Sequence, residues 1–184
     1  MGSTVVIYKS KYGFTKKYAE WIAQELDADI KEAAQTKPAD LKSYDVIIYG
    51  GGLYAGGVSG ISLLTKSFNI IKDKSLYLFT VGAADVTDEK NISNIQTGLQ
   101  KVLSPEMQKQ IKIFHFRGGI DYLKLNFVHR TMMVMLLNML KKKPESELLS
   151  EDKLMIETYG QTVDFSDRST ITPLVQAIKE NNKL

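Results

Sequence analysis

Short apolar runs alternate with amphipathic segments along most of the chain. The apolar runs are rich in β-branched and aromatic residues and carry few charges, which is typical of strands buried on both faces of a sheet. The amphipathic segments repeat apolar residues at intervals of three and four, which predicts helices with one face turned inward. The predicted strands are Thr4–Tyr8, Tyr44–Gly50, Leu76–Val81 and Ile111–Phe116, with Asp29–Ala33 as a polar edge strand. The predicted helices run from Thr15 to Leu26, over Ile61–Ile71 and Ile92–Leu103, and through Leu174–Ile178. This alternation indicates an α/β fold with a parallel sheet covered by helices on both faces.

The turn between the first strand and the first helix reads Ser10-Lys11-Tyr12-Gly13-Phe14-Thr15. A strand that feeds a helix through such a turn leaves unpaired backbone N–H groups beside the positive end of the helix dipole, which is an arrangement suited to a phosphate. Ser10 and Thr15 add hydroxyl donors, and Gly13 lets the backbone bend closely around a ligand. The alternative is an ordinary connection in which Thr15 caps the helix.

The spacing of hydroxyls and glycine in this turn resembles the phosphate loop of the flavodoxin family, Ser/Thr-x-x-Gly-x-Thr after the first strand. The resemblance implies a flavodoxin-like, doubly wound sheet of five parallel strands in the order 2-1-3-4-5, within a single domain spanning residues 1–184. It also implies non-covalently bound FMN as the cofactor. In such sheets the ligand lies at the carboxyl ends of the strands where the strand order reverses. The segments Ser10–Thr15, Gly50–Gly57 and Gly82–Asp85 are therefore expected to converge.

The glycine-rich segment after the third strand is predicted to be a loop against the flavin ring. Gly52, Leu53, Tyr54, Ala55 and Gly56 combine backbone that can approach a planar ring with an aliphatic and an aromatic side chain. By the resemblance, a carbonyl in this loop accepts the proton on N5 of the reduced ring, and Tyr54 is the expected stacking partner. The alternative is a flexible turn in which Tyr54 is merely half-buried.

The loop after the fourth strand, Gly82-Ala83-Ala84-Asp85, falls where the family has its second flavin loop. Its small residues would let backbone amides face the pyrimidine edge of the ring. Asp85 is expected either to accept a hydrogen bond from the ring N3–H or to cap the helix that begins before Glu89.

Composition narrows the chemistry. The 184 residues are 43% hydrophobic and 24% charged, as in an ordinary globular protein. The absence of cysteine excludes disulfides, thiol nucleophiles and iron–sulfur ligation, and two histidines make a multi-histidine metal site implausible. A net charge of +3 gives no argument for nucleic acid. The N-terminus does not resemble a signal peptide, so a cytoplasmic location is expected.

The inserted segment 115–145 departs from this regular pattern. Between Thr131 and Leu140 only Asn138 interrupts a Met-rich apolar run, and Lys141–Lys143 follow it. Such a helix is too short to span a bilayer, which takes roughly 20 residues. It is expected to cover the sheet, to form a homodimer interface, or to present a surface to a hydrophobic substrate or, through residues 122–143, to a membrane.

The strand that ends in His115–Gly119, followed by Tyr, Lys and Arg residues mixed with the Met-rich helix, resembles the flavodoxin-type, menaquinone-dependent protoporphyrinogen oxidases. In that family an inserted segment interrupts the last strand region near the flavin. The resemblance implies an FMN-dependent oxidoreductase with a porphyrinogen as substrate and a quinone as acceptor. Arg117 and Arg130 are expected to pair either with substrate propionates or with surface acids.

Two other functions remain open. One is an electron carrier without a substrate of its own, although such carriers are usually acidic. The other is a domain without flavin that acts through protein contacts at the Met-rich helix. No catalytic acid or base can be named from the sequence, and His115 and His129 are expected to be packing residues.

Overall fold

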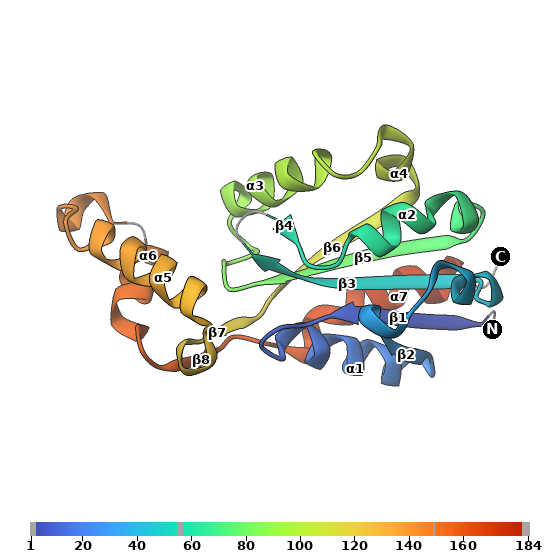
Figure 1. Ribbon diagram of the computed structural model, residues 1–184, viewed down its shortest axis with the longest axis horizontal. Helices are drawn as coiled ribbons and strands as arrows, with labels where there is room; N and C mark the ends of the chain where they lie inside the picture. The colour runs from blue at the N-terminus through green and yellow to red at the C-terminus, as the bar shows by residue number, and fades with distance from the viewer. Residues whose placement is uncertain (1–2, 55–56, 149, 182–184) are drawn as a thin grey trace.

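The computed structural model describes residues 3–54, 57–148 and 150–181. Its sheet has five parallel strands in the order β2-β1-β3-β5-β6, and the short β4 pairs antiparallel with β3 (Figure 1). The predicted α/β fold and its strand order are confirmed. The strands are β1 (Thr4–Lys9), β2 (Asp29–Glu32), β3 (Val46–Tyr54), β4 (Gly57–Val58), β5 (Ser75–Gly82) and β6 (Ile111–Arg117).

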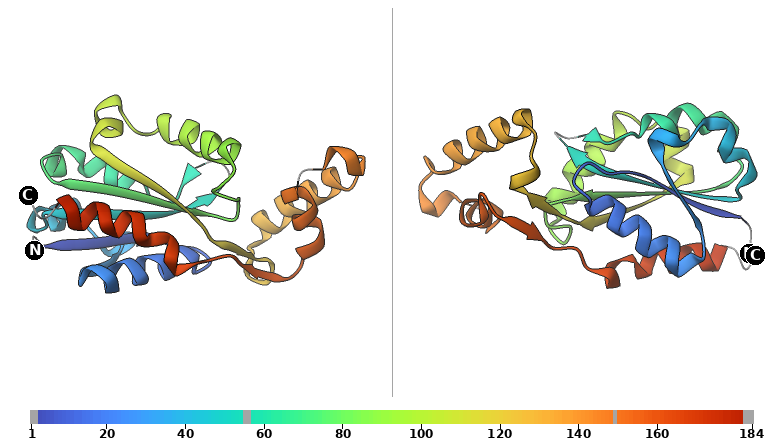
Figure 2. Two further views of the ribbon diagram at one scale, coloured as in Figure 1. Left: turned by 180° about the vertical axis from the view of Figure 1, so that it is seen from behind. Right: turned by 60° about the horizontal axis from the view of Figure 1, so that its bottom comes forward.

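Helices cover both faces of this sheet. Figure 2 shows α1 (Phe14–Leu26) and α7 (Thr172–Asn181) on one face and α2 (Ser62–Ile71) and α3 (Glu89–Gln100) on the other. Because successive side chains of a strand point to opposite faces, Val6 of β1 packs with the α1–α7 layer while Val5 and Ile7 pack with the α2–α3 layer. The remaining short helices are α4 (Pro105–Gln110), η1 (Ala33–Gln35), η2 (Pro38–Ser43), η3 (Tyr122–Lys124), η4 (Glu145–Glu147) and η5 (Arg168–Ile171).

A helical arm projects beyond the carboxyl ends of the strands (Figures 1 and 2). It consists of a two-stranded antiparallel ribbon, β7 (Gly119–Asp121) with β8 (Thr162–Asp164), and the helices α5 (Phe127–Leu140) and α6 (Ser150–Thr158). The expectation that the Met-rich helix covers the sheet is wrong, because α5 lies beyond the strand ends and buries only Leu137 and Leu140. Among the described residues, every helix falls short of the length and apolar character needed to cross a bilayer.

Asp121 ties the arm together at its base. Its buried carboxylate accepts from the backbone N–H groups of Leu123 and Lys124, from the Thr162 hydroxyl at 3.1 Å and from the Lys124 ammonium at 3.0 Å. The Lys124 cation and the Thr162 hydroxyl hold the pKa of Asp121 below its ordinary value. The same carboxylate therefore fixes β7 to β8 and starts the short helix that leads into α5.

His115 of β6 gives a prediction about stability and pH. Its Nδ1 lies 2.8 Å from the Thr80 hydroxyl, and burial lowers the pKa of the imidazole. The unfolded chain then binds this proton more readily than the folded chain does. The free energy of unfolding therefore keeps its full value above about pH 6.5 and falls as the pH drops toward the lowered pKa. His115→Gln should flatten this dependence in urea unfolding at pH 5 to 7.5; an unchanged slope would contradict it.

Candidate functional site

The N-terminus of α1 is open to an anion. Gly13 is the N-cap residue, with φ at +97°, and neither a side-chain cap nor an acidic residue occupies the first turn. By contrast, side chains cap α3, α4 and α5, which begin after Asp88, Ser104 and Asn126. The alternative in which Thr15 caps α1 is wrong, because Thr15 lies inside the first turn and is buried. The first N–H groups and the helix dipole are thus left for a ligand.

The rest of the turn shapes this opening. The Ser10 hydroxyl oxygen accepts the Gly13 N–H at 3.1 Å, which closes a tight bend and leaves the hydroxyl proton free to be donated elsewhere. Lys11 is exposed, with its ammonium 5.6 Å from the Tyr12 ring. The turn therefore combines backbone donors with one exposed cation.

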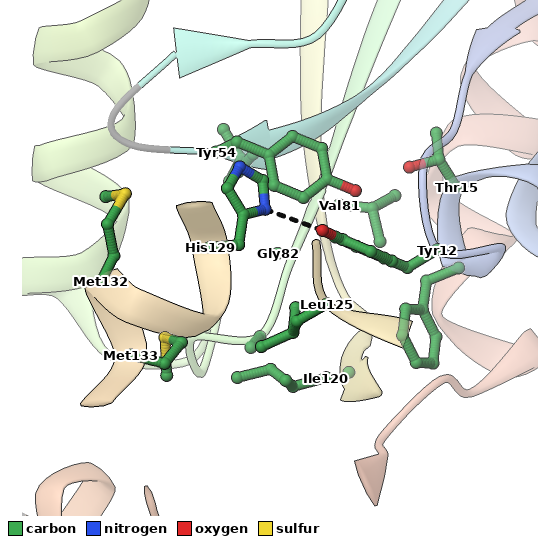
Figure 3. A pocket seen from close by; sticks show the side chains of 14 residues that line it. Tyr12, Thr15, Tyr54, Val81, Gly82, Ile120, Leu125, His129, Met132 and Met133 are labelled. Carbon is green, nitrogen blue, oxygen red and sulfur yellow. Dashed lines mark hydrogen bonds between the residues drawn. The ribbon is translucent and has the colours of Figure 1, made fainter. Parts of the chain in front are cut away.

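The three segments predicted to converge do so around one cavity of about 210 Å³. The turn before α1, the end of β3 and the end of β5 each supply part of its wall, and the arm supplies the rest (Figure 3). The lining residues are Tyr12, Phe14, Thr15, Leu53, Tyr54, Val81, Gly82, Ala83, Gly119, Ile120, Leu125, His129, Met132 and Met133.

An aromatic cluster forms one side of the cavity. The Tyr54 and His129 rings stack with centroids 5.6 Å apart and an interplanar angle of 27°, and Tyr12 meets Tyr54 edge-on at 5.8 Å. The Tyr12 hydroxyl lies 2.8 Å from His129 Nδ1, so a hydrogen bond joins the turn before α1 to the arm (Figure 3). Burial raises the pKa of the Tyr54 phenol above its ordinary value.

The glycine-rich segment is only partly a loop. Residues 51–54 continue β3 and pair with β5 and β4, so the prediction of a loop there is wrong. Gly52 does not line the cavity; a side chain at its position would meet the Tyr54 ring at 2.8 Å, which shows how closely that ring folds over the strand. Ala55 and Gly56, also predicted to bind the cofactor, lie outside the described residues.

The loop after β5 divides between two cavities. Gly82 lines the cavity of about 210 Å³, Ala84 lines a second cavity together with Arg117, and Ala83 lines both. Asp85 accepts from the Thr87 backbone and hydroxyl and lies 3.3 Å from the Arg117 guanidinium. The alternative in which Asp85 caps α3 is wrong, because Asp88 is the capping residue. The Asp85 side chain is also absent from the lining of the cavity of about 210 Å³.

Three interactions with the protein hold Arg117. Its Nε donates to the Ala83 carbonyl, its Nη1 donates to the Asp85 carboxylate, and its guanidinium lies 4.1 Å from the centre of the Phe165 ring. Arg130 is exposed on α5. Of the two arginines, Arg117 therefore follows the expectation of pairing with an acid of the protein.

The arm contributes a wall of the cavity that was not predicted from the sequence. Ile120, Leu125, His129, Met132 and Met133 line the cavity, and His129, expected to be a packing residue, is its histidine. The available signal was the position of His129 on the face of α5 shared with Met133 and Leu137, four and eight residues further on. Among the described residues, no group of three His, Asp or Glu side chains could hold a metal ion.

Comparison with known proteins gives one family. Residues 5–147 match the flavodoxin domain family. A curated, uncharacterized protein of Methanocaldococcus jannaschii is 40% identical over 53 residues, which are 28% of this chain and 35% of that protein. The match thus spans about a third of the length of that relative.

Two solved structures are similar to the chain at low sequence identity. One is a flavoprotein of Lactobacillus acidophilus in complex with FMN, with 18% identity, a TM-score of 0.43, and coverage of 64% of this chain and 93% of that one. Another is an oxidised flavodoxin of Bacillus cereus, with 18% identity, a TM-score of 0.39, and coverage of 61% and 84%.

Proposed function

The chain belongs to the flavodoxin domain family, and on that premise we propose that it binds FMN non-covalently and works as an oxidoreductase. The observation that carries the proposal is the position of the uncapped α1 N-terminus at the mouth of an aromatic-walled cavity. A phosphate and a flat ring are the two chemical features of FMN, and the protein offers a separate surface for each.

The phosphate would be held by the turn before α1. The backbone N–H groups of the first turn are donors without a side-chain competitor, and Thr15 adds a hydroxyl at the cavity wall. A side chain at Gly13 would meet nothing within 4 Å, so there is open space above this turn. The turn therefore offers both hydrogen-bond donors and space for a phosphate dianion.

The ring would lie among Tyr54, His129 and the small residues Gly82 and Ala83. The aromatic side chains offer a stacking face, and Gly82 and Ala83 bring backbone close to the opposite edge. Apolar walls exclude water, which strengthens every polar contact made inside.

Bound FMN would supply the redox chemistry, accepting and passing on one or two electrons. The chain's own part is to position the ring and to manage protons beside it. Among the lining residues the ionisable side chains are Tyr12, Tyr54 and His129, and a hydrogen bond joins Tyr12 to His129 at one wall.

The substrate we propose is a lipophilic redox molecule of the porphyrinogen or quinone class, as in the protoporphyrinogen oxidases that the sequence resembles. Apolar side chains of the arm support it, since Ile120, Leu125, Met132 and Met133 all face the cavity. Methionine side chains adapt to irregular apolar ligands.

A second candidate is an electron carrier with no substrate of its own. The cavity of about 210 Å³ favours it, because pockets for small molecules usually run from about 300 to 1,000 Å³. A flavin alone would then fill the space.

Anaerobic turnover tests the proposal and separates the candidates. The protein loaded with FMN and photoreduced should be reoxidised by a soluble quinone far faster than free reduced FMN. With that quinone in excess as the terminal acceptor, it should oxidise a porphyrinogen over many cycles, with one quinone reduced for each pair of electrons removed. Rapid quinone reduction without any oxidation of porphyrinogens would support the quinone as acceptor and refute the porphyrinogen as substrate. Failure of both reactions, together with rapid electron transfer to an acceptor protein, would identify an electron carrier.

Tyr54 provides a prediction about the ring site. Tyr54→Leu keeps apolar bulk but removes the aromatic face, and aromatic pairing is worth about 0.5–1.5 kcal/mol beyond burial. The Kd for FMN should rise by about 3- to 10-fold, measured by quenching of flavin fluorescence. Tyr54→Phe, which keeps the ring, should stay close to the wild type; equal losses in both variants would mean that stacking is not the contribution of Tyr54.

A further inference from the structure

The outer face of α5 carries an apolar stripe that no other part of the described chain covers. Val128, Met132, Met135 and Met139 follow one another at spacings of four, three and four residues, so they lie on one side of the helix. They are between 48% and 63% exposed. Leu123 in η3 and Phe127 at the start of α5 are still more exposed, at 74% and 84%. A continuous apolar surface of this kind marks a site of interaction.

The segment from Tyr122 to Pro144, which contains this stripe, has side-chain charges of a single sign. From Tyr122 to Pro144 the chain has no Asp or Glu, and its five cations are Lys124, Arg130, Lys141, Lys142 and Lys143. Lys124 and Lys143 have carboxylate partners in Asp121 and Asp152. Within the described part of the chain, the other three cations form no ion pair.

We propose that the arm docks on the surface of an anionic lipid bilayer, with the stripe of α5 in the headgroup and acyl boundary and the cations against the lipid phosphates. A helix with an apolar outer face and basic ends is suited to lie in that boundary. A second copy of this chain is a poorer occupant, because pairing two α5 helices would bring together those same three cations of each copy, with no acid between Tyr122 and Pro144 to offset them.

The cavity and the stripe are continuous. Met132 lines the cavity and also belongs to the stripe, and Met133 beside it faces inward (Figure 3). A lipophilic redox partner dissolved in the bilayer would therefore reach the cavity along apolar side chains without crossing water. This last step rests on the proposed function, whereas the docking of the arm does not.

Sedimentation with vesicles tests the docking. The full chain should pellet with vesicles of phosphatidylglycerol and phosphatidylcholine and far less with phosphatidylcholine alone, and salt should weaken the binding because it screens the cations. The double variant Met135→Glu/Met139→Glu should lose at least about 10-fold in partitioning, since it places two carboxylates in the apolar boundary. Lys141→Glu/Lys142→Glu should lose the preference for anionic vesicles.

Matched controls come from the sheet domain. Val102→Glu changes a side chain that is 47% exposed at the end of α3, and Lys101→Glu/Lys109→Glu reverses two exposed lysines far from the arm. Both should bind vesicles nearly as the wild type does, and thermal unfolding should show all variants folded. Losses of equal size in the controls would overturn the proposal.

The oligomeric state tests whether a second copy of this chain, in place of a bilayer, covers the stripe. Light scattering after gel filtration should show a wild-type monomer; a dimer that Met135→Glu/Met139→Glu dissociates would assign the stripe to a second copy. Vesicle binding by protein that takes up no FMN would leave the docking in place while refuting the proposed function. Absence of vesicle binding by an FMN-loaded protein would do the reverse.

Discussion

Gly13→Asp is expected to raise the Kd for FMN by at least about 30-fold. The change places a carboxylate at the N-terminus of α1, where Gly13 is the N-cap and no acidic residue stands in the first turn. Two unit charges about 4 Å apart repel by about 4 kcal/mol at an effective dielectric constant of about 20, and half of that energy already corresponds to the stated factor. The carboxylate also competes for the same N–H groups. Isothermal titration with FMN measures the effect.

Gly13→Asn is the matched control. It has the same size and faces the same positive φ of 97°, a backbone region that asparagine and aspartate both tolerate better than other side chains. It adds no charge, so the loss for FMN should stay below about 10-fold. If the Asp and Asn variants bind FMN equally, the turn does not hold a phosphate.

Gly119→Ala is expected to detach the arm from the sheet. A Cβ at this position would lie 2.0 Å from the Val163 carbonyl oxygen and 2.8 Å from the Phe14 ring. The carbonyl belongs to the partner strand of the ribbon, where Gly119 pairs with Asp164, so it cannot move aside cheaply. Overpacking of this kind costs about 1–3 kcal/mol or more, and the upper figure corresponds to about a 100-fold loss of amide protection in β7 and β8.

Hydrogen exchange read by mass spectrometry would localise that loss. Exchange should accelerate across the ribbon and α5 while β1 and β3 stay protected, and FMN binding should weaken because the arm carries one wall of the cavity. Gly57→Ala is the control, since the nearest atom to its Cβ would be 3.7 Å away. Unchanged protection of β7 in Gly119→Ala would contradict the tight contact of the arm with α1.

The sheet was predictable because burial on both faces leaves a plain signal. β1, β5 and β6 are short apolar runs bounded by polar turns, and the structure extends the predicted ends by only one residue on either side. The end of β3 was not predictable in this way. Gly50, Gly51 and Gly52 have low strand propensity, yet pairing with β1, β5 and β4 keeps the segment extended as far as Tyr54. Tertiary pairing overrode local preference.

The turn before α1 was located correctly from the sequence, but its geometry was not. Nothing in the residue types distinguishes Thr15 as a cap from Gly13 as a cap, because the choice depends on whether the backbone enters the left-handed region. Similarly, Asp85 and Asp88 both precede α3. Only the structure shows that the Asp88 carboxylate accepts the Lys90 N–H in the first turn of α3, while the Asp85 carboxylate accepts the Thr87 N–H.

The arm was the least predictable part. Its ribbon consists of two three-residue strands more than 40 residues apart, too short for a periodic pattern. The Met-rich run was visible in the sequence, but whether it covered the sheet or left it depended on that ribbon. The role of His129 in the cavity follows from the same placement, since the ribbon sets the first turn of α5 beside the turn before α1, where the Tyr12 hydroxyl meets the His129 ring.

Titration of the flavin-free protein with FMN and with riboflavin tests the central claim most directly, because the two ligands share the ring and differ in the phosphate. Two charge-assisted hydrogen bonds at the α1 N-terminus are worth about 3 kcal/mol or more. The account therefore predicts one FMN per chain, bound at least about 100-fold more tightly than riboflavin. Equal affinity for both ligands, or no binding of either, would contradict it.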